Sequence, residues 1–332
     1  MTPQSTERAL FPVISTGFPT GGPTLGEVGE QQVIRAIMEA APSTINGDDA
    51  AVLTPPAPNS RVVATTDMLV EGRHFLPEYT TPHQVGRKAV VQNFADIEAM
   101  GARPAAALLA ISAPDSLPLA VVAQLAEGIH SKVEEYSTEL VGGDVTGGAS
   151  LVISISAIGS LGGSLEPLTL GRARPGQRVV AHGRIGYSAA GLALLRAGVD
   201  VPGELEPLVE AHQAPHLTPG RGVVARAAGA TAMTDNSDGL VRDSGLLADR
   251  SSVAIDLDPG AIAPDTLLTA AGELLGEDPW KWVLTGGEDH ALLGTIEGEA
   301  PAGFRTIGAV RRGAGVTVGG EAPAYRTGWE SF

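Results

Sequence analysis

The stretch PHQVGRKAVVQNFADIEAMGARPAAALLAIS, residues 82–112, predicts a helix followed by a strand. Pro82 suits the first turn of a helix, where its missing amide would have no partner in any case. We expect the helix to run to about Met100, and the apolar run AAALLAIS to form a buried strand. Asp96 and Glu98 stand near the end of this helix, so two acidic side chains lie close to the point where the strand begins.

The alternation of helix and strand extends to both sides of this stretch. TLGE at 24–27 has the spacing of a capping box and starts the first expected helix, and the glycine-rich GSLGGS at 159–164 separates two such patterns. Expected strands lie at 49–53, 61–70, 105–112, 139–143, 151–159, 177–183, 231–233, 253–257 and, as the last, 290–296; further helices lie at 118–136, 188–198, 204–213, 219–228 and from Leu240. The fold class is therefore α/β or α+β, with a mobile tail at 1–24 and domains at 25–160 and 161–332.

Composition narrows the class of protein further. The 332 residues contain 22 Lys+Arg against 38 Asp+Glu, a net charge of −16, and no cysteine. Such acidity opposes contact with a nucleic-acid backbone, although it also serves solubility alone. No apolar run approaches the roughly 18 residues of a membrane span, and the first residues do not read as a secretion signal. We expect a cytoplasmic protein that binds neither nucleic acid nor membrane.

Six short acidic loops follow or precede apolar segments. They are NGDDAA (Asp48, Asp49), ATTDM (Asp67), NFADIEAMG (Asp96, Glu98), VGGDVTGG (Asp144), TDNSDG (Asp235, Asp238) and TGGEDH (Glu288, Asp289). Any one of them alone fits an ordinary turn or helix cap. Six together would repel one another unless a cation compensates, and hard oxygen ligands favour Mg²⁺, which leaves positions open for phosphate oxygens. We expect a Mg²⁺–phosphate site.

Other phosphate-binding and catalytic motifs fit this sequence less well. No glycine is followed by lysine, which excludes a P-loop, and GRGVVA at 220–225 reads as a plain helix start. GYSAA at 186–190 is a near match to a nucleophile elbow, with Ser188 as nucleophile and His290, His216 or His212 as base. That hydrolase interpretation leaves the acidic loops unexplained, and the small residues also leave helix amides available to an anion. His74 follows Asp67 by seven residues and either faces a ligand or is an ordinary satisfied histidine.

Taken in order, GDDAAVL, TTDMLVEGRHF, KAVVQNFADIEAMGA, VGGDVTGG, DNSDGLVRD, TGGEDHALL and GWESF resemble the thiamine-monophosphate kinase family. The resemblance covers nearly all of the chain from about Thr24. It implies the superfamily of aminoimidazole ribonucleotide synthetase and selenophosphate synthetase, with an N-terminal domain whose strands join those of a partner in a homodimer. The implied reaction transfers the γ-phosphoryl group of ATP to thiamine monophosphate with several Mg²⁺ ions.

The resemblance also implies roles for individual residues. Asp49, Asp67, Asp96, Asp144, Asp235 and Asp238 resemble Mg²⁺ ligands, supported by Thr65 and Thr66; Gly143, Asp144 and Ser237 resemble ATP contacts; His74, Glu288 and Trp329 resemble thiamine-phosphate contacts. Asp48 and Asp289 are expected to support these groups indirectly. No strong general base is expected, because the acceptor is a phosphate that is already anionic at neutral pH.

Several positions depart from the family pattern. Gly147 and Leu170 stand where arginines are usual, which leaves Arg172 or Arg174 to replace an ATP contact, and Asn236 and His290 also differ. Selenophosphate synthetase usually carries a reactive cysteine or selenocysteine that this chain lacks. A non-catalytic nucleotide sensor is the remaining alternative, against which the near-complete acidic set argues.

Overall fold

The computed structural model describes residues 17–45, 53 and 59–329. Its α-helices are α1 Leu25–Val28, α2 Glu30–Ala40, α3 Pro82–Ala99, α4 Leu119–Glu135, α5 Tyr187–Ala197, α6 Glu206–Gln213, α7 Arg221–Ala227, α8 Leu240–Ser251, α9 Thr266–Leu275 and α10 Pro279–Thr285. Its strands are β1 Arg61–Val70, β2 Arg103–Ala113, β3 Leu140–Gly147, β4 Val152–Leu161, β5 Arg178–His182, β6 Ala230–Asp235, β7 Ala254–Leu257, β8 Leu292–Ile296, β9 Arg305–Arg311 and β10 Gly315–Val318. Short 3₁₀ turns lie at Pro77–Tyr79, Leu170–Arg172 and Gly203–Leu205. Among these helices none combines the length and apolarity needed to cross a membrane.

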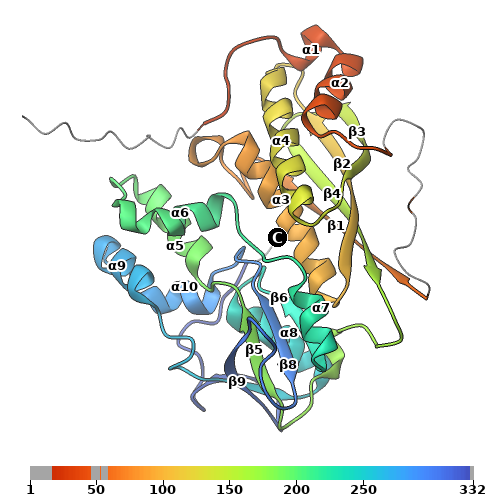
Figure 1. Cartoon of the computed structure of the whole chain (residues 1–332). Coiled ribbons are helices and arrows are strands. Elements are labelled where there is room, and N and C mark those ends of the chain that lie inside the picture. Colours follow the sequence, from red (N-terminus) through yellow and green to blue (C-terminus); the bar gives the residue numbers. More distant parts are fainter. Residues whose placement is uncertain (1–16, 46–52, 54–58, 330–332) are drawn as a thin grey trace, which may run out of the picture.

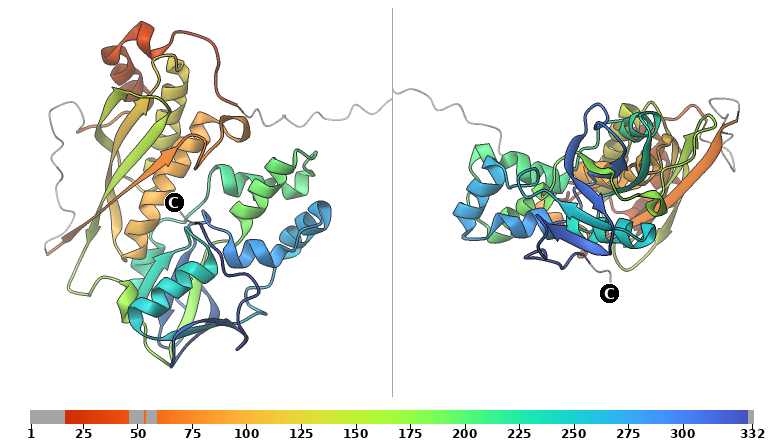
Figure 2. Two further views of the ribbon diagram at one scale, coloured as in Figure 1. Left: turned by 180° about the vertical axis from the view of Figure 1, so that it is seen from behind. Right: turned by 90° about the horizontal axis from the view of Figure 1, so that it is seen from below.

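The first sheet has strand order β1-β4-β2-β3, with β2 and β3 parallel and the other pairs antiparallel. Residues of β4 alternate between buried and half-buried, because every second side chain faces the core beneath α3 and α4. No described helix covers the opposite face (Figures 1 and 2). One face of this sheet is thus packed and the other is open. The expected fold class, a mixture of helices and strands, is confirmed.

The second sheet has strand order β10-β7-β9-β5-β8-β6, and α8 packs against β6, β7 and β10. The helices α5, α6, α9 and α10 gather beside it in Figure 1. Here the sequence prediction was incomplete: residues 290–296 do not form the last strand, because β9 and β10 follow, and α9 and α10 precede it. The missed strands are rich in glycine, arginine and threonine, and β9 is held by its pairing with β5 and β7 rather than by an apolar run of its own.

The segment before α1 differs from the expected mobile tail over residues 17–24. The Gly17 amide donates to the Thr80 carbonyl, and the rings of Phe18 and Phe75 stack with centroids 6.0 Å apart. Thr24 caps α1 in the predicted capping box with Glu27. These residues are therefore part of the packed first domain, whereas residues 1–16 lie outside the described part of the chain.

The helix α3 joins the two domains. It packs on β1 and β4 and also contacts β6, β8, α6 and α7, and the apolar residues Val91 and Ala95 share a buried cluster with Met233 and Leu292. Glu98 is fully buried, and its carboxylate oxygens each accept a 2.6 Å hydrogen bond from the amides of Gly220 and Gly222. Glu98 therefore caps the start of α7 and does not join the other acidic loops.

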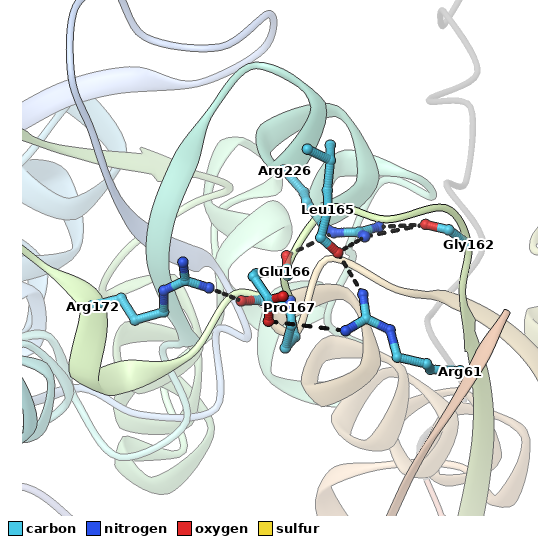
Figure 3. A network of polar contacts seen from close by, with 7 residues as sticks. All are labelled: Arg61, Gly162, Leu165, Glu166, Pro167, Arg172 and Arg226. Carbon is cyan, nitrogen blue, oxygen red and sulfur yellow. Dashed lines mark hydrogen bonds and ion pairs between the residues drawn. The ribbon is translucent and has the colours of Figure 1, made fainter. Parts of the chain in front are cut away.

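The segment that links the domains is held by arginines from both sides, as Figure 3 shows. Arg226 of α7 donates to the carbonyls of Gly162, Leu165 and Glu166, while Arg61 of β1 reaches the same Leu165 carbonyl. Carbonyls in an irregular segment need such donors because no neighbouring strand supplies them. The position of one domain against the other thus depends on Arg226, whose side chain is almost fully buried.

We expect Arg226→Ala to lower the free energy of unfolding by about 1–3 kcal/mol, because the linker carbonyls lose their donors. Urea denaturation followed by circular dichroism measures this. Arg312→Ala, at an exposed turn, is the control and is expected to change stability by less than about 0.5 kcal/mol. Equal effects of the two substitutions would contradict the assigned role of Arg226.

Candidate functional site

Four of the predicted metal ligands converge where the two domains meet. Asp67 lies near the end of β1, Asp96 in the last turn of α3, Asp235 at the end of β6 and Asp238 in the loop before α8. Burial and, after it, the negative charge of Asp235 raise the pKa of Asp96 to about 7. The pKa of Asp67 is raised by burial and then by Asp235, and that of Asp238 by burial with additions from Asp235 and Asp67. The fold thus brings these four carboxylates, the acidic group, together from four separate segments of the chain.

Neighbouring polar groups orient these carboxylates. The Thr65 hydroxyl donates to Asp96 Oδ2 at 2.7 Å, and its support of a metal ion stays a prediction. Asn93, buried in α3, accepts from the Asp67 amide at 3.0 Å and donates to the Ala89 carbonyl. A loop or strand end that presents a carboxylate to other carboxylates needs such fixed neighbours, because repulsion otherwise separates them.

The donor set of the acidic group fits Mg²⁺. All its ligating atoms are hard carboxylate and hydroxyl oxygens, and burial with like-charge repulsion leaves the group in need of a cation. Within the described residues, however, no three His, Asp or Glu side chains are close enough to form a complete metal cage. Mg²⁺ ordinarily binds through one or two carboxylates together with substrate phosphates, so an incomplete protein cage suits a Mg²⁺–phosphate site.

Other predicted ligands are placed elsewhere or lie beyond the described residues. Asp144 and Thr66 are on the open face of the first sheet, since Asp144 pairs with the exposed Ala110 and the Thr66 hydroxyl bonds Ser156 at 2.9 Å. Gly143 has no room for a side chain, because a Cβ there would lie 1.8 Å from the Leu109 carbonyl. Asp48 and Asp49 fall outside the described part of the chain.

The three predicted acceptor contacts lie together beside the acidic group. The rings of His74 and Trp329 have centroids 5.9 Å apart, and the charge of Glu288 acts on His74. The Trp329 amide donates to the carbonyl of Asp238 at 3.0 Å, and the Glu288 amide donates to the carbonyl of Ser237 at 2.8 Å. The ring of Trp329 is 42% exposed, so it offers an aromatic face to a ligand.

The loop that carries Glu288 has an unusual backbone. Glu288 and His290 have φ angles of 64° and 50°, in the left-handed region that non-glycine residues seldom adopt. A Cβ on Gly287 would lie 2.2 Å from the Ser237 carbonyl, so the loop packs directly on the loop of Asp235 and Asp238. His290 Nδ1 lies 2.9 Å from Asp235 Oδ2, which holds the two loops together. Strain of this kind persists where surrounding contacts fix it, as at a binding site.

Comparison with known proteins agrees with this arrangement. The family model "AIR synthase related protein, N-terminal domain" matches residues 47–161. A thiamine-monophosphate kinase of Corynebacterium glutamicum is 63% identical over 326 residues, which cover 96% of this chain and 98% of the relative. The chain belongs to the thiamine-monophosphate kinase family.

Two more distant members support the assignment to this kinase family. The thiamine-monophosphate kinase of Mycobacterium tuberculosis is 43% identical over 320 residues, which cover 94% of each chain. The solved structure described as AaThiL complexed with AMPPCP and TMP has a TM-score of 0.75 and 32% identity, and the match covers 92% of this chain and 98% of that one. Membership makes the chain an enzyme of the kinase class.

The family assignment removes the hydrolase alternative, and the geometry around Ser188 agrees. Ser188 is 1% exposed, and its Oγ lies 3.2 Å from His212 Nδ1, the same nitrogen that faces Glu288 at 3.6 Å. A catalytic triad needs the nucleophile and the acid on opposite ring nitrogens. Asp289 accepts from the amides of Gly186 and Ser188, so the start of α5 is capped by this carboxylate and is not open to an anion.

The sequence resemblance left Arg172 or Arg174 to replace an arginine expected at Leu170, and the structure gives Arg172 a different partner. Arg172 donates to the Pro167 carbonyl at 3.3 Å in the linker network of Figure 3. Arg174 is exposed, and its amide donates to Gln177. Neither arginine is brought to the acidic group by a described contact, so the replacement of the family's arginine stays a prediction without support here.

Lys88 and Asp243 at this candidate site were missed from the sequence, and His212 was considered only as a base in the hydrolase alternative. Asp243 is buried in the first turn of α8 and accepts from the amides of Asp238 and Gly239, and burial with the charges of Asp235 and Asp238 raises its pKa to about 8. Lys88 offered a usable signal, because it stands three residues from both Val85 and Val91 on a helix face that is otherwise apolar. A lysine in that place indicates a buried ion pair.

Proposed function

We propose that the chain transfers the γ-phosphoryl group of ATP to thiamine monophosphate, which gives thiamine diphosphate and ADP. The observation that carries the proposal is the contact between the acidic group and the acceptor residues, in which Trp329 bonds the backbone of Asp238 while its ring lies beside His74. Phosphates of a donor and an acceptor could thus be held at one place. The names of the relatives support this reaction.

The proposed transfer needs no covalent intermediate with the protein. The acceptor phosphate has a second pKa near ~6, so its oxygen attacks without a strong general base. The new bond joins that oxygen to the γ-phosphorus, and the bond from the γ-phosphorus to the oxygen shared with the β-phosphate breaks. The protein aligns the two phosphates and provides a site whose charges are preorganised.

We propose that Asp67, Asp96, Asp235 and Asp238 hold Mg²⁺ with Thr65, and that Asp49, Asp144 and Thr66 add ligands. When bound, Mg²⁺ would neutralise the phosphate charges and so permit two anions to approach. Gly143 and Asp144 border a pocket of about 100 Å³ with apolar walls from Ile34, Ile37 and Met38, which suits the base of ATP. Ser237, whose Oγ lies 3.5 Å from Asp235 Oδ1, would contact the phosphates.

We also propose a homodimer that covers the open face of the first sheet with a second copy. Val62 and Met68 are 73% and 54% exposed on this face, and Leu108 is 37% exposed on the neighbouring part. Exposed apolar side chains on an uncovered sheet favour pairing with another sheet. Asp144 and Thr66 lie on the same face, so the second copy would enclose two predicted ligands that the single chain leaves in solvent.

The reaction is tested by incubating the protein with ATP, Mg²⁺ and thiamine monophosphate and measuring thiamine diphosphate. We expect Asp96→Asn to lower kcat by about a hundredfold or more, equivalent to about 2.7 kcal/mol, because one ligand and one charge are lost. The fold is expected to remain, since an uncharged residue relieves repulsion at the site. Asp200→Asn, at an exposed position, is the control; turnover of Asp96→Asn equal to that control would refute the role, and a wild type without product would refute the reaction.

The homodimer is tested by light scattering after size-exclusion chromatography. Met68→Lys would place a charge in the proposed interface, so we expect the dissociation constant to rise at least about tenfold, toward a monomer. Leu274→Lys makes the same exchange at a residue of α9 that is 44% exposed, and it should leave the dimer intact. A monomeric wild type, or a dimeric Met68→Lys, would show that the open face has another role.

A further inference from the structure

Lys88 is a buried cation between the two segments that carry the acceptor residues. Its side chain is 2% exposed, although it belongs to a residue type that is almost never buried without a partner. Its Nζ lies 2.8 Å from Glu288 Oε1 and donates to the His74 carbonyl at 3.2 Å. One ammonium group thus contacts an acceptor residue of each domain.

The pair that Lys88 forms with Glu288 is fixed on both sides. The other oxygen of Glu288 faces His212 Nδ1 at 3.6 Å, and burial together with the charge of Lys88 lowers the pKa of His212 to about 3, so that imidazole is neutral near pH 7. Burial is the largest influence on the pKa of Glu288 and raises it, yet the pKa is lowered overall, because the charge and the hydrogen bond of Lys88 act together with the neighbouring His212 and His290. Glu288 therefore remains a carboxylate whose charged partner is Lys88.

The two segments that Lys88 joins are short turns, each closed by backbone hydrogen bonds within its own domain. His74 lies in a turn closed by its own ring, whose Nδ1 accepts from the Val70 amide at 3.0 Å. Glu288 lies in the strained loop described above, with a φ of 64°. Among the described hydrogen bonds and ion pairs, those of Lys88 join the His74 turn to Glu288, so removal of the ammonium group would break this link while each turn keeps its own backbone bonds.

We propose that Lys88 is a positioning residue for the acceptor: it fixes the Glu288 carboxylate against the His74 turn and thereby sets the affinity for thiamine monophosphate, not for ATP. The inference rests on the proposed function and adds a residue to the same site. Lys88 acts through Glu288, so its loss and the loss of the Glu288 charge should disturb the same interaction.

A role in stability alone makes a different prediction, and the chain offers a matched comparison. Lys132 in α4 is fully buried and lies 2.7 Å from Glu135, so it forms a lysine–glutamate pair similar to that of Lys88. Its contacts, which include the ring of Tyr136 at 6.0 Å, involve none of the acceptor residues. Lys132→Met therefore reproduces the loss of a buried ammonium group without a change at the site.

The experiment compares Lys88→Met, Glu288→Gln, the double variant and Lys132→Met. The dissociation constant of thiamine monophosphate is measured by calorimetry, and KM is measured separately for thiamine monophosphate and for ATP. We expect Lys88→Met to raise the acceptor constants by about tenfold or more while KM for ATP stays within about twofold, as is usual when a residue that orients a ligand is lost. The double variant should be no worse than Glu288→Gln, because both act on one interaction.

Several results would overturn the inference. They are unchanged acceptor constants in Lys88→Met, equal changes in the two KM values, multiplicative effects in the double variant, or the same acceptor defect in Lys132→Met. If Lys88→Met does not fold, Lys88→Gln removes the charge and keeps a donor, and the same comparisons apply. A wild type that makes no thiamine diphosphate would instead refute the proposed function, whereas an active wild type with a normal Lys88→Met refutes only this inference.

Discussion

Repulsion among carboxylates at the domain junction is the constraint on which the rest of the structure depends. Asp67, Asp96, Asp235 and Asp238 are partly or fully removed from water, and several of them raise the pKa of their neighbours. We expect such a group to weaken the packed fold when no cation is bound, because its partners, His290 at Asp235, Thr65 at Asp96 and Arg242 at Asp238, do not balance four carboxylates. We therefore expect the proposed binding of metal and phosphate to stabilise this junction.

The helix α3 holds the elements around the acidic group in place through its polar side chains. Along its length Lys88 contacts the acceptor residues, Asn93 holds the end of β1, Asp96 joins the acidic group and Glu98 caps α7. These four polar side chains of α3 each have a partner on another element of the fold. The relative positions of donor and acceptor residues thus follow from one helix packed between two sheets (Figure 1).

Much of this could be predicted from the sequence, for identifiable physical reasons. The helix from Pro82 and the strand from 61 to 70 follow from periodicity and from a proline at the first turn, which are local signals. His74, Glu288 and Trp329 were expected at one site only through the family resemblance, since they are far apart in the chain. The partners of Glu98 and Asp289 were not foreseen, because both carboxylates bind backbone amides of a helix start and no local pattern indicates a cap that comes from elsewhere in the fold.

A calorimetric titration of Mg²⁺ into the protein, with a non-hydrolysable ATP analogue present, shows whether the domain junction binds a cation. We expect saturable Mg²⁺ binding that raises the melting temperature, and a loss of at least about tenfold in affinity in Asp235→Asn, because the charge of that carboxylate acts on Asp67, Asp96 and Asp238. Mg²⁺ affinity and melting temperature that are the same in wild type and Asp235→Asn would contradict the claim that this junction is a cation site.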